Sequence, residues 1–463
     1  MTTTDINAQP AGRANKFYFI AWRWHFYAGL YVIPFLMVLA TTGLTMLWIS
    51  WMAGVGGERT AVVPSGAPIA VAQLQATAEN AFPDGTATQY IAPLADNRAA
   101  TFVIESEDGS TGVVINPYSG EVLDSFAWRD GWYDFASNIH GSLLLGSFGD
   151  RMIEIAASLA IVLVASGLYL HWPRNSQGWR KTLVPQLSAK GRSFWKSLHG
   201  VVGFWISALL ILFLLSGLSW TGVWGSKMVQ AWSTFPAEKW GAPLSDTTHA
   251  DMNHNSVEEV PWALEQTPVP ASGSLKGVAA IQGEVTINKV AVFADSLAFD
   301  GRYQINIPQD DTGVWTLSHD SMSNDGPKPT QDRTIHIDRY TGNVLADVQF
   351  ADYTPYAKAM AIGIALHEGD MGILNFVLNT VFCLSVLLVS ASGLILWWKR
   401  RPASAGNLSA PPRPDDLPFW KGAAALVVAL GVMFPMAGAA IVVVLLIDVT
   451  VLRMVPAMKR AVS

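Results

Sequence analysis

Four histidines at the edges of long apolar segments are the residues of this chain best suited to chemistry. His25 and His199 each begin a stretch with a glycine four residues later, and His140 and His367 occupy loosely matching places in the two halves of the chain. Neutral imidazole is a good axial ligand of haem iron, so the repeated arrangement predicts paired axial ligands. The sequence contains one cysteine, Cys383, and therefore no Cys-x-x-Cys-His motif. The expected cofactor is haem b, bound without a covalent link.

The elements that must position these histidines are apolar blocks of membrane-spanning length. The chain has 463 residues, of which 51% are hydrophobic and 14% are charged. Each of the first four blocks has close to the ~20 residues needed to cross a hydrocarbon core, with Trp or Tyr at an end. The N-terminal tail lacks the cleavage-site pattern of a signal peptide, so the first block is expected to remain as an anchor. The blocks are residues 26–49, 152–172, 201–224 and 374–398, and a fifth covers 423–447.

The fifth block is interrupted by Pro435, which leaves two alternatives. A proline inside a helix removes a backbone hydrogen bond. The block is therefore either a short helical hairpin that turns at Pro435 or one kinked span, and the chain crosses the membrane five or six times.

Lysine and arginine residues predict the orientation. They crowd the N-terminus, the loop around residues 174–196 and the loop around 399–421, which are cytoplasmic by the positive-inside rule. Segments 53–138 and 225–366 then lie outside. Both must be stabilised by their own cores, because Cys383 lies within an apolar span and neither can form a disulfide.

The two outer segments resemble each other. Residues 113–123 and 334–345 each predict a β-hairpin, with alternating apolar residues around a turn that contains glycine. Further strands are expected over 100–105 and 303–308, and a helix over 71–82. Each outer segment is thus predicted to be a small α+β module.

The depth of the histidines predicts how they pair. His25 and His199 lie one or two turns into helices that start on the cytoplasmic side, whereas His140 and His367 lie near the outer boundary. His171 would be roughly 46 Å from His140 along a continuous helix and cannot share an iron with it. The predicted pairs are His25 with His199 and His140 with His367. The alternative is that these histidines only form hydrogen bonds between helices.

Several short motifs resemble the PepSY-associated transmembrane family, which includes iron-regulated inner-membrane proteins and ferric-siderophore reductases. The likeness covers most of residues 17–401, although His171 occupies a position where the family tends to have Trp, as the second half here does at Trp397. The resemblance implies two haems stacked across a bacterial inner membrane, which relay electrons from the cytoplasmic side to an outer acceptor. The motifs are Arg23-Trp-His25-Phe-Tyr-Ala-Gly29, Ile139-His-Gly-Ser-Leu-Leu-Leu-Gly146, Ser166-Gly-Leu-Tyr-Leu-His-Trp-Pro-Arg174, Trp195-Lys-Ser-Leu-His199 and Ser392-Gly-Leu-Ile-Leu-Trp-Trp-Lys-Arg400.

The expected fold class is a mainly α-helical membrane protein. It comprises a duplicated transmembrane four-helix bundle, one or two C-terminal helices and two small α+β PepSY-like extracytoplasmic modules. The predicted segments are a cytoplasmic tail (1–16), a first span (17–52), the first PepSY-like module (53–138), the outer histidine with the second span (139–173), a cytoplasmic loop (174–193), the third span (194–224), the second PepSY-like module (225–364), the outer histidine with the fourth span (365–400), a second cytoplasmic loop (401–418) and the C-terminal helix or hairpin (419–452).

Other residues are weaker candidates for binding the haem or contacting the acceptor. Arg23, Arg129 and Arg151 could hold haem propionates through bidentate contacts or could simply anchor the spans. His171 is an alternative inner ligand, but its place at a helix end favours an interfacial role. Two further pairs of histidines are assigned to surfaces, the first to a solvated loop and the second to a strand. A group of aromatic residues could form an outer rim that contacts the acceptor. These are His249 with His254, His319 with His336, and the aromatic residues Trp128, Trp132, Tyr133 and Tyr353.

The leading hypothesis for function is a ferric-chelate reductase. No glycine-rich dinucleotide loop follows a strand, so electrons must come from a membrane quinol or a separate cytoplasmic reductase. The acceptor would be a ferric siderophore or another ferric chelate outside the membrane. The alternatives are a non-catalytic membrane protein whose outer modules bind a periplasmic partner, and a transporter of metal or siderophore. A transporter would more typically have charged residues or broken helices at mid-membrane.

Overall fold

Four helices of the computed structural model are long and apolar enough to cross a membrane. The structure describes residues 13–173, 178–253, 259–299, 301–323, 325–401, 408, 410, 411 and 421–454. Each of the first four apolar blocks of the sequence corresponds to one of these helices, which supports a membrane protein. They are α1 (Arg13–Met52), α4 (Gly146–His171), α6 (Gly191–Leu218) and α9 (Ile373–Trp398).

The last apolar block forms two helices that pack against each other, α10 (Lys421–Met433) and α11 (Pro435–Met454). The chain turns between them at Phe434 and Pro435, where the proline cannot continue the hydrogen bonding of α10. This is a helical hairpin and not one kinked helix. Arg174, residues 1–12 and most of the predicted 401–418 loop lie outside the described residues.

Contacts divide the chain into two units. The first comprises residues 1–41, 145–225 and 381–463, and the second comprises residues 42–144 and 226–380. Within the first unit, α4 packs against α6 and α11. The second unit contains every strand among the described residues.

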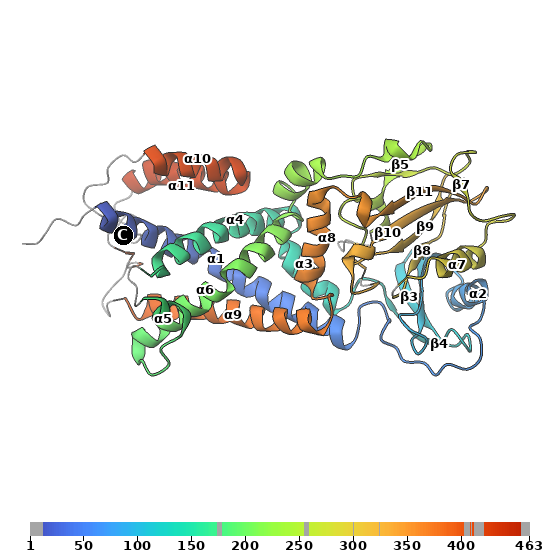
Figure 1. Cartoon of the computed structure of the whole chain (residues 1–463), viewed down its shortest axis with the longest axis horizontal. Helices are drawn as coiled ribbons and strands as arrows, with labels where there is room; N and C mark the ends of the chain where they lie inside the picture. The colour runs from blue at the N-terminus through green and yellow to red at the C-terminus, as the bar shows by residue number, and fades with distance from the viewer. Residues whose placement is uncertain are drawn as a thin grey trace, which may run out of the picture. The chain divides into compact units, whose positions relative to one another are not determined.

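The strands of both outer segments join in one nine-stranded antiparallel sheet (Figure 1). Its order is β4-β3-β2-β1-β8-β9-β10-β11-β7, so the halves meet at the pair β1 and β8, where Gln89 lies opposite Asn306. The two predicted α+β modules are thus one continuous sheet. The strands are β1 (Thr86–Ile91), β2 (Ala100–Ser106), β3 (Gly109–Ile115), β4 (Val122–Ala127), β7 (Val278–Ala279), β8 (Gln304–Asn306), β9 (Val314–His319), β10 (Arg333–Asp338) and β11 (Asn343–Gln349), and a separate pair is β5 (Leu244–Thr248) with β6 (Pro268–Pro270).

Both predicted hairpins are present, and the same turn chemistry closes them. In the first, the side chain of Asn116 accepts a hydrogen bond from the backbone of Tyr118, and in the second Asp338 accepts one from Tyr340; both are 2.9 Å long. Gly120 and Gly342 then adopt φ angles of 74° and 70°, which favour glycine. This repeated Asx turn explains why the two stretches are so alike in sequence.

The two faces of the sheet differ in polarity. One face packs on α2 (Val71–Ala81) and α7 (Ile287–Ser296), with Phe102, Leu317 and Ile335 in its buried core. The helix predicted over 71–82 is therefore α2, whereas α7 was not predicted. Because side chains alternate along a strand, the neighbours of these apolar residues point to the other face. That face carries buried polar side chains, namely Gln89, Thr101, Gln304, Thr316, Ser318, Thr334 and His336.

Two short helices precede the spanning helices α4 and α9. They are α3 (Trp132–Ser142) and α8 (Pro355–Glu368). Leu143 and Gly369 end them in the left-handed conformation, with φ angles of 53° and 97°. His140 and His367 therefore lie on separate short helices and not on the spanning helices, which corrects the use of one continuous helix for residues 139–173.

Candidate functional site

His25 on α1 and His199 on α6 face each other within the first unit. Their ring centroids are 6.2 Å apart and the ring planes are nearly perpendicular, at 87°. Both histidines are only partly exposed. The structure thus brings together two of the four histidines singled out from the sequence.

Equivalent hydrogen bonds hold the two rings of this pair, His25 and His199, which we call the inner pair. His25 Nδ1 lies 3.0 Å from the carbonyl oxygen of Leu163 and 3.1 Å from Ser166 Oγ. His199 Nδ1 lies 3.0 Å from the carbonyl oxygen of Val389 and 3.1 Å from Ser392 Oγ. A carbonyl can only accept, so Nδ1 carries the proton and Nε2 keeps a free lone pair. This is the tautomer that a metal-binding histidine needs.

His140 on α3 and His367 on α8 form a second pair, within the second unit. Their ring centroids are also 6.2 Å apart, with an interplanar angle of 83°. His140 Nδ1 lies 2.9 Å from Thr42 Oγ1. Burial, together with the facing His140, lowers the pKa of His367 to about 3, so this imidazole is neutral at physiological pH.

Two asparagines fix the end of the helix that carries His367. Asn379 Nδ2 donates to the carbonyl oxygens of Leu366 and His367 at 2.7 and 3.0 Å, and Asn375 Nδ2 donates to that of Leu366 at 2.9 Å. The last carbonyls of a helix lack partners within it, and these amides satisfy them. The backbone next to His367 is therefore held in one place.

The spacing of both pairs fits haem iron. Metal–imidazole bonds are about 2.0–2.1 Å long, and each ring adds about 1.1 Å from nitrogen to centroid, so two axial imidazoles have centroids about 6 Å apart. Three glycines lie directly against the rings. A Cβ added at Gly167 would lie 3.0 Å from His25 Cε1, and one at Gly393 or Gly43 would lie 3.4 Å from Cε1 of His199 or His140. The residues present therefore fit a bis-histidine haem at each pair, whereas no three His, Cys, Asp or Glu residues gather around a bare metal ion in the described part of the chain.

A sequence signal for these supports was overlooked. A hydroxyl residue followed by Gly and Leu occurs once in each spanning helix, at residues 42–44, 166–168, 216–218 and 392–394. Three of these supply the hydroxyl and the glycine that contact His140, His25 and His199. The spacing from His25 to Thr42 equals that from His199 to Ser216, at 17 residues. The repeated triplet thus identifies the support of three of the four histidines.

His171 lies beside the inner pair but is oriented differently. Its Nε2 lies 3.1 Å from the carbonyl oxygen of Thr182 and therefore carries a proton as a donor. Its ring occupies the space over Gly200, where an added Cβ would come within 2.5 Å of Nδ1. The arrangement favours a packing role at the end of α4.

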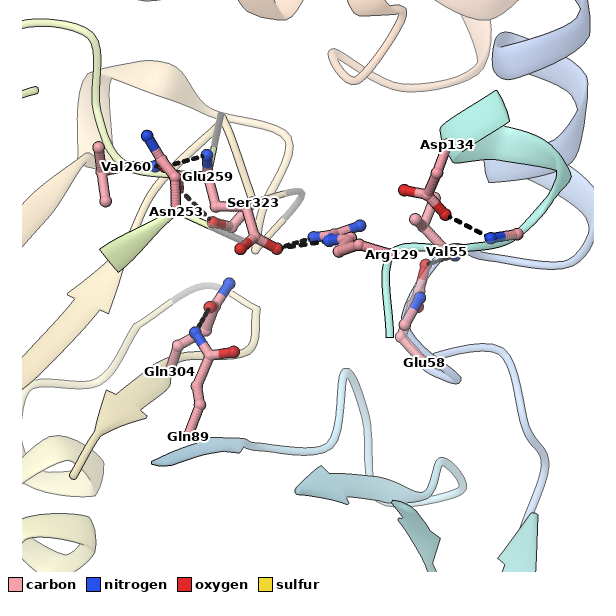
Figure 2. A network of polar contacts seen from close by, with 12 residues as sticks. Val55, Glu58, Gln89, Arg129, Asp134, Asn253, Glu259, Val260, Gln304 and Ser323 are labelled. Atoms are coloured by element: carbon pink, nitrogen blue, oxygen red, sulfur yellow. Dashed lines mark hydrogen bonds and ion pairs between the residues drawn. The ribbon is translucent and has the colours of Figure 1, made fainter. Parts of the chain in front are cut away.

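The three arginines considered for propionate binding have protein partners. Arg129 forms a buried ion pair with Glu259, with Nε 2.6 Å from Oε1 (Figure 2). Arg151 pairs with Asp150 and lies 3.7 Å from Glu154. The guanidinium of Arg23 donates to Tyr27 and to the carbonyl of Pro411. Propionate binding by these arginines stays a prediction.

Three histidines assigned to surfaces are in fact buried. His249 and His336 are fully buried and meet each other, and His319 is 2% exposed and stacked on Phe299. For His249 and His336 the assignment was wrong because residues within 226–253 and 259–270 cover the polar face of the sheet, which period-two patterns cannot reveal. His319 lies on the opposite face, with Leu317, and is buried against Phe299. His254 lies outside the described residues. Of the aromatic rim residues, Trp132 is exposed, but Trp128 and Tyr353 are buried and cannot present a surface to an acceptor.

Comparison with known proteins identifies one family. The model described as "PepSY-associated TM region" matches residues 22–400, which include all four paired histidines. A search of curated proteins finds no match.

Proposed function

The chain belongs to the PepSY-associated TM region family, and from that premise we propose that it is a di-haem b oxidoreductase of a bacterial inner membrane. It would carry electrons from the cytoplasmic side to a ferric siderophore or another ferric chelate on the periplasmic side. The single observation that carries the proposal is the repetition of facing imidazoles with centroids 6.2 Å apart. Such pairs are rare by chance in an apolar bundle, where unpaired polar groups are costly.

The proposal gives each residue of the two pairs a defined task. His25 and His199 would hold one haem and His140 and His367 the other, and each haem would supply reversible one-electron transfer between ferric and ferrous iron. Leu163, Ser166, Val389 and Ser392 orient the inner rings and keep their Nε2 lone pairs free. Rings held in this way need little reorganisation when the charge of a bound metal changes.

The fold behind this function would be a duplicated transmembrane bundle with a pseudo-twofold axis along the membrane normal. Matching hydrogen bonds at Ser166 and Ser392 support this arrangement, as do matching short helices before α4 and α9. Basic residues at the start of α6, among them Lys190, Arg192 and Lys196, support a cytoplasmic position for that end. The N-terminus would then be cytoplasmic, and the electron donor a membrane quinol or a cytoplasmic reductase.

Haem counting followed by reoxidation kinetics tests the proposal. Detergent-purified protein, expressed with ample haem precursor, should show a Soret band and about two haems per chain in a pyridine haemochrome assay. Stopped-flow mixing of the reduced protein with ferric hydroxamate should reoxidise it, and ferrous iron should appear in a ferrozine trap. A colourless protein would overturn the proposal, and a haem protein that no ferric chelate reoxidises would overturn the choice of acceptor.

A further inference from the structure

A second pair of histidines lies on the polar face of the sheet, and the proposed haem function does not use it. His249 begins the short 3₁₀ helix η4 (His249–Met252), and His336 lies on β10. Their Nε2 atoms are 2.9 Å apart, and both side chains are fully buried. Sequence analysis placed both at surfaces, so the juxtaposition comes from the structure alone.

The hydrogen bonds on the opposite sides of the rings allow two proton arrangements. His249 Nδ1 lies 2.7 Å from the carbonyl oxygen of Thr267, which fixes the proton on Nδ1 and leaves Nε2 without one. His336 Nδ1 lies 2.9 Å from Thr316 Oγ1, which can donate or accept. With a proton on its Nε2, His336 donates to His249. With the proton on Nδ1, both Nε2 lone pairs are free to bind one cation, and no proton needs to leave the protein.

Burial keeps both rings available as neutral ligands. It lowers the pKa of His249 to about 4 and, together with the neighbouring His249, the pKa of His336 well below its usual range. Neutral imidazole is the metal-binding form of histidine.

A thioether lies one 3₁₀ turn after His249. Met252 is three residues after His249 on η4, and residues three apart eclipse one another on a 3₁₀ helix. His249 and Met252 both line one small cavity. The sulfur of Met252 is within 3.8 Å of Asn306 Nδ2, on the sheet side of that cavity.

Most residues that line the cavity are polar, and two of them have buried atoms without a hydrogen-bond partner. Gln89 Oε1 and Thr334 Oγ1 have none, and both residues line the cavity at 4% and 1% exposure. Figure 2 shows Gln89 reaching Gln304 at the centre of the sheet, with Glu259 on the covering segment. Unsatisfied buried polar atoms are unusual and indicate a missing ligand or water.

We propose that His249, His336 and Met252 form a binding site for one cuprous ion. Two imidazoles and a thioether are a soft donor set, and thioether ligands select Cu(I) among the common biological metals. A monovalent ion also costs less to bury than a divalent one. At bonds of about 2.0–2.1 Å, the two nitrogens need to separate by only about half an ångström to bind one ion together. The site is independent of the haem pairs, because its ligands and theirs are different residues.

Anaerobic competition with a cuprous chelator tests the site in the full-length protein. Wild-type protein should take about one Cu(I) per chain from bathocuproine disulfonate, and copper X-ray absorption should show nitrogen and sulfur scatterers. Met252→Leu keeps the side-chain volume, and it should weaken Cu(I) binding at least tenfold and remove the sulfur signal. The matched control Met228→Leu replaces a methionine that is 36% exposed, and it should bind as wild type does.

A second variant tests the imidazoles. His336→Gln should abolish Cu(I) uptake, whereas His319→Gln, at a buried histidine of the neighbouring strand β9, should not. Haem content and circular dichroism report whether each variant folds. If His336→Gln does not fold, Met252→Leu alone tests the copper site. The proposal is overturned if wild-type protein takes no Cu(I), if Met252→Leu binds it as wild type does, or if Zn(II) binds more tightly than Cu(I).

Discussion

The inner and outer histidine pairs have the same ring spacing but are supported in different ways. His25 and His199 lie on long apolar helices, and a backbone carbonyl and a serine hydroxyl hold each ring. His140 and His367 lie on short helices whose ends are fixed by left-handed residues and, at His367, by asparagine amides. Spanning helices alone position the inner pair. The outer pair also uses them, through Thr42 and the two asparagines, but depends in addition on the folded region that carries α3 and α8. Changes to the outer region should therefore affect one pair and spare the other.

If the proposed function is right, the largest expected effect is the selective loss of one haem from either pair. His199→Ala and His367→Ala should each reduce haem from about two per chain to about one, because a single imidazole holds haem far less well than two. The pyridine haemochrome assay measures the ratio, and redox titration identifies which haem remains. His171→Ala is the control and should keep both haems, since its Nε2 is occupied by Thr182. If His171→Ala lost the inner haem and His199→Ala kept it, the inner ligand would be His171 and not His199.

The ion pair of Arg129 and Glu259 should stabilise the region around the outer histidine pair and not the region around the inner pair. Arg129 precedes α3, and the pair is buried, with side chains 12% and 8% exposed. Arg129→Ala leaves the Glu259 carboxylate buried without its partner, which should cost about 3–5 kcal/mol of stability in the outer region. Thermal melts followed by the absorbance of each haem should show the outer haem lost at lower temperature.

Arg333→Ala is the matched control for this ion pair. It breaks a pair with Asp347 whose side chains are 25% and 33% exposed, and it should cost about 0–1 kcal/mol. Equal shifts in the two variants would show that burial does not decide the cost. A parallel shift of the inner haem in Arg129→Ala would contradict the independence of the two regions.

Asp332 should make the outer region sensitive to pH. Burial raises the pKa of this carboxyl to about 7, although hydrogen bonds from Ser321 oppose the shift. Because the folded state holds this proton more tightly than the unfolded state, the contribution of Asp332 to stability is most favourable below about pH 4 and falls by roughly 1.4 kcal/mol per pH unit up to about pH 7. Asp332→Asn should flatten this dependence and raise the melting temperature at pH 8. If the temperature at which the outer haem is lost depended on pH in Asp332→Asn as it does in the wild type, the pH dependence would not come from Asp332.

Local patterns in the sequence predict the repeated parts of this fold well. The hairpins at 113–123 and 334–345 are present because their Asx turns and alternating apolar residues are local features. The pairing of the histidines also follows from the sequence, since equal depth in related helices brings the rings to one level. The hydroxyl-Gly-Leu triplets could have predicted the supports of the rings as well.

The sequence could not predict what depends on contacts between distant segments. The union of β1 with β8 joins residues more than 200 apart, and no local pattern encodes it. His249 and His336 look like surface residues because the segment that covers them is irregular and has no period. Asp332 and Glu259 are likewise buried, so the charged groups that now distinguish the outer region were also hidden.

The smallest expected effect compares two glycines of the inner pair. A Cβ at Gly167 would lie 3.0 Å from His25 Cε1, whereas one at Gly393 would lie 3.4 Å from His199 Cε1. Gly167→Ala should therefore displace its imidazole by a few tenths of an ångström and change the inner haem's electron paramagnetic resonance spectrum and potential, with both haems kept. Gly393→Ala meets ordinary van der Waals distance and should change them less. Because both variants add one methyl group to the same kind of helix, a larger change in Gly393→Ala would mean that ring contact does not determine the geometry of the inner pair.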